Sequence, residues 1–178
     1  MITFRELTAD EIEIRIGMCK ENGLTLLLYK DARCDMAILD ETVGAENWER
    51  EHYECKGNLF CKVGINTNYK KEDSIPNWVY KSDCGSESNT EKEKGEASDS
   101  FKRACVNWGI GRELYTAPFM WIKKEGCQIE FFTFQGKTKY KCDDKFIVEK
   151  IAIDNKKITG IAIRNATLNK RVFVWQKQ

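Results

Sequence analysis

Two adjacent cations, Lys102 and Arg103, lie in a segment whose hydrophobic pattern predicts an amphipathic helix that stops before the glycines at 109 and 111. The apolar stripe of this helix consists of Ala97, Phe101, Ala104, Cys105 and Trp108. Both cations fall outside the stripe, where an ammonium and a guanidinium could hold phosphate oxygens. Cations on the exposed side of a helix are also ordinary solubilising residues, and the pattern alone favours that explanation. A phosphate-binding role therefore depends on the rest of the chain.

Few other residues have the types and spacing that catalysis requires. The segment 136–138 (Gly-Lys-Thr) matches the end of a phosphate-binding loop, but Phe131 stands where that loop needs its first glycine. The adjacent carboxylates Asp143 and Asp144 would point to opposite faces of a strand, so a turn explains them better than a magnesium site. His52 is the only histidine, which excludes mechanisms that need two. We therefore expect no enzyme activity and no cofactor.

The chain has eight cysteines but no Cys-x-x-Cys pair. His52, Cys55 and Cys61 come nearest to a zinc site, and they lack a fourth ligand at a suitable spacing. The N-terminus has no signal sequence, and no apolar run reaches the ~20 residues of a membrane span. We expect a soluble cytoplasmic protein without a metal site, in which reduced cysteines serve as small hydrophobic side chains.

The composition limits the classes of partner. The 178 residues are 42% hydrophobic, which is enough for one substantial core. Lys and Arg number 29 against 28 Asp and Glu, so the formal net charge is +1. A balance so close to neutral gives no general attraction to a polyanion. A nucleic-acid partner would need the positive charge gathered on one surface.

The first thirty residues predict a helix followed by a strand. Thr8 and Glu11 have the spacing of a helix capping box. The apolar residues that follow recur at helical spacing until Gly23, and they are Ile12, Ile16 and Cys19. The short apolar run 24–29 then has the length of a strand.

The next part predicts a helix and a three-stranded meander. Asp31 is a suitable N-cap and Gly44 a suitable end for a helix over residues 32–43. The segments with strand texture are 48–56, 58–66 and 77–84, with Gly57-Asn58 as the tight turn between the first two.

A second capping box, Thr90 with Glu93, predicts that the helix carrying Lys102 and Arg103 begins near Glu91. That helix would span about 18 residues, or on the order of 27 Å. It follows the meander directly and supplies an apolar stripe that can cover one face of the strands.

The part after Pro118 is rich in strand patterns. Residues 146–153, 158–163 and 171–175 alternate as antiparallel strands, and the repeated Ile-Ala-Ile at 151 and 161 fits pairing across a hairpin. We expect them to form a small sheet of their own. Lys137, Lys139 and Lys141 alternate along another possible strand. They could face a nucleic acid, but lysines also protect strand edges against aggregation, and we favour that role.

These patterns predict an α+β fold in which an antiparallel β-meander packs against a long amphipathic helix. The C-terminal hairpin sheet is an addition to this β-β-β-α core. We expect a core domain over residues 1–117 and a β-rich extension over residues 118–178, as parts of one globular unit.

Two blocks of sequence extend this reading to a family. The first runs from Tyr29 to Trp48 and contains Lys-Asp-Ala-Arg33, and the second runs from Glu96 to Tyr115 and contains Phe-Lys102-Arg103-Ala. Together with the meander between them, they resemble the annealing domain of the Rad-fifty-two family, including its phage Sak-type relatives. The likeness extends over about residues 8–116.

The resemblance implies an ATP-independent protein, encoded by a phage or prophage, that binds single-stranded DNA and anneals complementary strands in recombination or repair. Lys102 and Arg103 would hold the DNA backbone at the base of a groove, and Arg33 would add a phosphate contact. Possible counterparts of the family's second DNA site are Lys62, Lys81 and Arg112. A ring or helical homo-oligomer, working with an exonuclease and a single-strand-binding protein, is also implied.

The chain departs from the family at Val106, where another cation is frequent, and at Gly95, which replaces a longer side chain. The groove is therefore expected to be less positive than in relatives. Without the resemblance, Arg33 would be read as a surface residue paired with Asp31 or Asp35. The alternative function is a non-catalytic accessory module that binds another protein of a recombination or replication complex.

Overall fold

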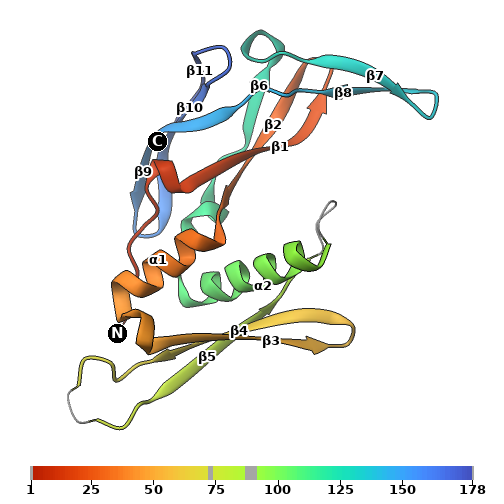
Figure 1. Ribbon diagram of the computed structural model, residues 1–178. Helices are drawn as coiled ribbons and strands as arrows, with labels where there is room; N and C mark the ends of the chain where they lie inside the picture. The colour runs from red at the N-terminus through yellow and green to blue at the C-terminus, as the bar shows by residue number, and fades with distance from the viewer. Residues whose placement is uncertain (1, 72–73, 87–91, 178) are drawn as a thin grey trace. The chain divides into compact units, whose positions relative to one another are not determined.

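The computed structural model describes residues 2–71, 74–86 and 92–177. It is a mixed α+β structure made mostly of antiparallel strands, with two α-helices among the described residues (Figure 1). The chain forms two compact units. The first contains Met1–Glu6 and Asp31–Arg112, and the second contains Leu7–Lys30 and Glu113–Gln178. The domain boundary expected after residue 117 stays a prediction.

The first unit begins its regular structure with α1 (Ala32–Val43), which confirms the predicted helix. The carboxylate of the N-cap Asp31 accepts a hydrogen bond from the N–H of Arg33 at 2.6 Å. The helix ends at Gly44, whose φ of 85° lies in the region that glycine adopts without strain. The turn η2 (Ala45–Asn47) then leads into a sheet.

Three antiparallel strands form this sheet in the order β3-β4-β5, and they are β3 (Trp48–Cys55), β4 (Asn58–Asn66) and β5 (Trp78–Cys84). They confirm the three predicted strands. The turn between β3 and β4 consists of Lys56 and Gly57, with φ of 53° and 74°, and Asn58 already pairs with Cys55. The prediction of the turn at Gly57-Asn58 was therefore wrong by one residue.

The sheet has two different faces because side chains alternate along each strand. Cys61, Val63 and Ile65 of β4 are fully buried and point to one face. The helix α2 (Lys92–Trp108) contributes contacts to that face (Figure 1). Trp108 Nε1 donates to the carbonyl of Val63 at 3.0 Å, and the Phe101 ring stacks on Trp48 with centroids 6.1 Å apart. The predicted capping residue Thr90 and the predicted start at Glu91 lie outside the described residues.

The second unit contains a six-stranded antiparallel sheet in the order β11-β10-β9-β1-β2-β6. Its strands are β1 (Ile12–Lys20), β2 (Gly23–Lys30), β6 (Met120–Lys123), β9 (Phe146–Asp154), β10 (Lys157–Asn165) and β11 (Lys170–Gln176). The end strands β11 and β6 approach each other, so the sheet is nearly closed. The expectation that the C-terminal strands form a sheet of their own was wrong, because β9 pairs with β1 at Glu13 and Ile147.

The predicted N-terminal helix was also wrong, because residues 12–20 form the strand β1. The capping box exists, since the Thr8 N–H donates to Glu11 Oε2 at 2.9 Å, but it supports only the short 3₁₀ turn η1 (Ala9–Glu11). Ile12, Ile14 and Ile16 alternate with polar residues and are β-branched, which suits a strand. This alternation, paired along β2, overrides the weaker helical spacing.

The C-terminal hairpin agrees with its prediction. Asn155 and Lys156 form a two-residue turn with φ of 47° and 61°, and Ile151 pairs with Ile161. A separate two-stranded sheet consists of β7 (Glu130–Phe134) and β8 (Lys137–Lys141). The remaining short 3₁₀ turns are η3 (Arg112–Thr116) and η4 (Lys124–Gly126).

All eight cysteines are free thiols, and three of them, Cys61, Cys105 and Cys127, are buried. Burial raises the pKa of Cys61 to about 11 and that of Cys127 to about 12. These thiols are therefore poor nucleophiles and pack as small apolar side chains. Neither α-helix in the described part of the chain combines the length and the apolar character needed to cross a bilayer.

Candidate nucleic-acid interface

Arg33 lies in the first turn of α1, beside the N-cap carboxylate. Its Nε is 3.3 Å from Asp31 Oδ1, and its side chain is 85% exposed. Asp31 is one of the two carboxylates expected for it. The contact fixes part of the guanidinium at the helix start while its outer edge faces solvent.

Lys102 acts on the same carboxylate from α2. The pKa of Asp31 is held below its usual range, first by the hydrogen bond from the Arg33 N–H and further by the charges of Arg33 and Lys102. The two helices are in contact within the first unit. The charge of Lys102 therefore acts on the carboxylate that Arg33 contacts, although the two cations are far apart in the sequence.

Arg103, the next residue of α2, turns toward β5. Successive residues of a helix are about 100° apart around its axis, so neighbouring cations reach different partners. Arg103 Nε is 3.3 Å from Asp83 Oδ1. The other oxygen of Asp83 accepts a hydrogen bond from the Asn107 side-chain amide at 3.2 Å.

Lys81 and Arg112 meet at the C-terminal end of α2. Lys81 Nζ donates to the carbonyl of Asn107 at 2.9 Å, and Arg112 Nη2 donates to the same carbonyl at 3.1 Å. Arg112 also reaches the carbonyl of Val106 at 3.0 Å. Carbonyls at the end of a helix lack intrahelical donors and attract cations. Through Asn107 and Asp83, these two cations join Arg103 in one hydrogen-bonded network.

Lys62 lies apart from the other five predicted residues. It alternates with the buried Cys61 and Val63 of β4, so its side chain points to the opposite face of the sheet. There its Nζ is 2.6 Å from Glu51 Oε2 and 5.0 Å from the centre of the Tyr80 ring. The hydrogen bond to Glu51 raises the pKa of Lys62.

The face that carries Lys62 also presents aromatic residues that the site prediction missed. Tyr53 stacks on Phe60 with centroids 5.5 Å apart, and Trp78 stacks on Tyr80 at 6.5 Å. The hydroxyl of Tyr80 donates to Glu49 at 2.8 Å. Alternation within the predicted strands was the available signal, because Trp78 and Tyr80 are two positions apart in one of them.

The residues that link the cations, Asp83 and Asn107, were missed as well. Asn107 was visible only as a polar residue in the last turn of the expected helix, and Asp83 only as a residue near a strand end. Their roles depend on the pairing of β5 with α2 side chains, which no local pattern encodes.

Comparisons with protein-family models, curated proteins and solved structures give no match for this chain. Within the described ranges, no group of three or more His, Cys, Asp or Glu side chains is placed to hold a metal ion. What the arrangement supplies is positive charge and directed N–H donors. Such groups bind phosphate or carboxylate oxygens.

Proposed function

We propose that this chain binds single-stranded DNA along the α1 and α2 side of its first unit and anneals complementary strands without ATP. The observation that carries the proposal is the convergence of predicted cations. Arg33 contacts Asp31, whose pKa is lowered further by the charge of Lys102, and Lys81, Arg103 and Arg112 share the Asp83–Asn107 network. Lys62 lies on the other sheet face and is left out of this surface.

The proposal includes the finer architecture implied by the family resemblance. In it, α2 and the β3-β4-β5 meander form the β-β-β-α core of a Rad-fifty-two-like, phage-type annealing protein. Copies of the chain assemble into a ring or helical filament and work with an exonuclease and a single-strand-binding protein in the host cytoplasm. A ring would join the cations of successive subunits into one track for the DNA backbone.

The chemistry needed for annealing is electrostatic. Arg103 contacts Asp83 through its Nε. A guanidinium carries its N–H donors in a rigid fork whose geometry suits phosphate. A strand held by its phosphates leaves its bases open to pair with a second strand. Base pairing then drives the reaction, and the protein contributes charge neutralisation and proximity.

The first experiment measures the annealing rate of two complementary labelled oligonucleotides with and without the protein, in the absence of ATP and over a series of salt concentrations. We expect acceleration that weakens as salt rises, because log affinity falls by about 0.7 per neutralised phosphate for each tenfold rise in salt. A folded protein that neither binds the strands nor accelerates annealing would overturn the proposal.

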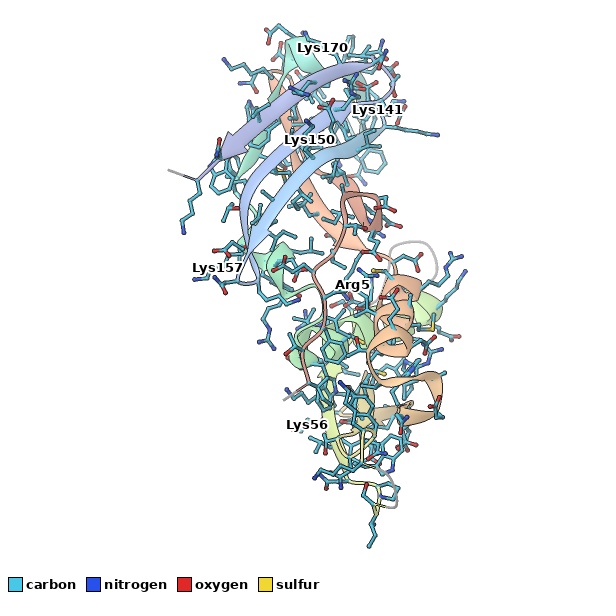
Figure 2. All side chains as sticks on the ribbon, turned by 90° about the vertical axis from the view of Figure 1, so that its left-hand side faces the viewer. Arg5, Lys56, Lys141, Lys150, Lys157 and Lys170 are labelled. Carbon is cyan, nitrogen blue, oxygen red and sulfur yellow. The ribbon has the colours of Figure 1, made fainter. Side chains whose placement is uncertain are left out.

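The site itself is tested with Lys102→Gln/Arg103→Gln. Loss of two phosphate contacts should lower the salt slope of single-strand binding by about 1.4. The matched control is Lys150→Gln/Lys157→Gln, which removes the same charge from exposed positions on β9 and β10 (Figure 2). Equal binding by both double variants would exclude Lys102 and Arg103 from the surface.

A second candidate function is favoured by the aromatic face of β3-β4-β5. Tyr53 and Tyr80 are exposed there, next to Glu49 and Glu51. Exposed aromatic residues in a patch are typical of protein-binding surfaces. A monomer that fails to bind DNA, but whose capture of a recombination protein is abolished by Tyr53→Ser/Tyr80→Ser, would support an accessory module.

A further inference from the structure

The β7–β8 hairpin of the second unit exposes a cluster of large aromatic side chains. Phe132 is 39% exposed and Phe134 49%, and Phe131 is more exposed than either. A single exposed apolar residue is ordinary, but several within one five-residue strand are unusual for a surface without a partner. In Figure 1 the hairpin extends beyond the six-stranded sheet of its own unit, with its turn at the free end.

The register of the hairpin sorts these side chains onto two faces. Phe132 pairs with Lys139, and Phe134 pairs with Lys137, so the partners of each pair share a face. Lys141, opposite Glu130, lies on the same face. Phe131 and its partner Tyr140 lie on the other face. One face therefore places phenylalanines of β7 beside lysines of β8, with Glu130 at the end away from the turn. We call Phe132, Phe134, Lys137, Lys139 and Lys141 on this face the Phe-Lys face.

The charge of the Phe-Lys face is only partly compensated. Lys141 contacts Glu130 at 3.2 Å and Asp143 at 2.8 Å. Among the described residues, neither Lys137 nor Lys139 has a carboxylate oxygen within ion-pair distance. Lys139 Nζ instead lies 4.6 Å from the centre of the Phe134 ring. The face thus attracts an anion and presents flat apolar rings beside the cations.

Edge protection, which the sequence favours for these lysines, does not explain the face. The sheet has only two strands, so β7 and β8 each have an unpaired outer edge. All three lysines are on β8, and β7 consists of Glu-Phe-Phe-Thr-Phe without a lysine or proline. If these lysines served only to prevent aggregation at strand edges, the more apolar strand β7 would remain unprotected.

The backbone of the hairpin favours a defined platform. Gln135 and Gly136 form a two-residue turn with φ of 50° and 72°, which matches the twist of the strands and fixes their register. Alternate lysines of β8 are then about 6.8 Å apart along one side. A regular row of cations beside aromatic rings fits a polymer with repeated negative charge and flat, unpaired bases.

We propose that the Phe-Lys face is a second contact surface for single-stranded DNA, in which Lys137 and Lys139 bind phosphates and Phe132 and Phe134 stack on unpaired bases. The proposal rests on the proposed function for the identity of the polymer. It differs from the surface on α1 and α2 because it contacts the bases by stacking as well as the backbone. Duplex DNA, whose bases are already stacked, is a poor ligand for this face.

The test compares binding of an oligothymidylate with binding of a strand of the same length made of abasic sites. Both strands carry the same phosphates, so only the first can stack. We expect the natural chain to prefer oligothymidylate by about tenfold or more. In Phe132→Leu/Phe134→Leu that preference should largely disappear, whereas Lys137→Gln/Lys139→Gln should weaken binding of both strands and lower the salt slope by about 1.4.

Two controls keep the test specific. Phe131→Leu makes the same change on the opposite face and should bind both strands as the natural chain does. Lys150→Gln/Lys157→Gln removes equal charge elsewhere in the same unit. All variants concern exposed side chains, so circular dichroism and thermal unfolding should match those of the natural chain.

The outcomes separate the two proposals. Failure of the natural chain to bind either strand overturns both. Loss of binding in Lys102→Gln/Arg103→Gln, with natural behaviour of both hairpin variants, overturns the hairpin surface alone. The reverse result supports the hairpin and overturns the site on α1 and α2. Hairpin-dependent binding to vesicles of anionic phospholipid, without a preference for oligothymidylate, would identify a membrane surface instead and overturn the assignment to DNA.

Discussion

The cations of the first unit and those of the β7–β8 hairpin look alike in the sequence but differ in their surroundings. Arg103 contacts Asp83, and Lys81 contacts the carbonyl at the end of α2. Lys137 and Lys139 have no carboxylate within ion-pair distance in the described part of the chain. The sequence alone therefore does not show whether a cation stabilises the fold or is available to bind a ligand.

The two environments suit different tasks in binding a strand. The electric field of a cation with a fixed partner is partly cancelled by that partner, but the side chain is already oriented. A cation without a partner keeps its full field and its mobility, and it attracts phosphates from a distance. Comparing stability with affinity in matched variants distinguishes these roles.

The largest difference between the two regions is expected in the unfolding free energy that is lost when a phenylalanine is replaced. Phe101 is fully buried between α2 and β3, with its ring on Trp48 and Arg50. Phe101→Ala should lower the free energy of unfolding by about 3–5 kcal/mol. Phe131→Ala, on the exposed hairpin, should change it by less than about 0.5 kcal/mol. Urea denaturation followed by tryptophan fluorescence measures both.

Similar losses in the two phenylalanine variants would mean that the hairpin is part of a packed core. Its phenylalanines would then be structural, and the contrast with the first unit would disappear. A small effect of Phe101→Ala would instead show that the cations on α2 do not depend on the apolar stripe beneath them.

A smaller difference in unfolding free energy is expected when a lysine is replaced in each region. Lys81 caps a helix carbonyl and lies 4.7 Å from the centre of the Trp108 ring, so Lys81→Met should cost about 1 kcal/mol of unfolding free energy. Lys139→Met should leave stability within about 0.5 kcal/mol of the natural value. Thermal unfolding at low salt compares them, and equal effects would refute the division into structural and open cations.

Much of the fold followed from local patterns. The caps Asp31 and Gly44 bound α1, and strand alternation located the meander and the C-terminal hairpin. The strand β1 was missed because a real capping box preceded it, and because spacing of three and four residues coexisted with alternation. Its correct state depends on β2 and β9, and such distant pairing leaves no signature in a short window.

The candidate site was also predictable only in part, because local patterns indicate residue types and elements but not distant partners. The types and approximate elements of the cations could be inferred, since charge on an amphipathic helix is visible in its pattern. Their partners could not, because Asp83 reaches Arg103 and Asn107 only once β5 and α2 are side by side. The phenylalanines of the hairpin needed a register before they could be assigned to the lysine side.

The smallest expected effect is on single-strand affinity, when cations of the first unit lose a nearby carboxylate and so resemble the lysines of the hairpin. Asp31→Asn removes the carboxylate that Arg33 contacts and whose pKa the charge of Lys102 lowers, while asparagine remains a good N-cap for α1. Single-strand affinity at low salt should rise roughly two- to fivefold, since a competitor for phosphate has been removed. An unchanged affinity, measured by fluorescence anisotropy, would place Arg33 and Lys102 outside the binding surface.

The same variant has a defined pH dependence. Because the folded chain holds the pKa of Asp31 below its ordinary value of about 3.9, the ionised carboxylate stabilises the fold above that pH. This contribution is lost as the pH falls through the lowered pKa, where the folded state also takes up the proton. The natural chain should therefore lose more unfolding free energy on acidification below about pH 4 than Asp31→Asn does. Parallel acid profiles would mean that Arg33 and Lys102 are as open as the lysines of the hairpin, and the two regions would bind DNA in the same way.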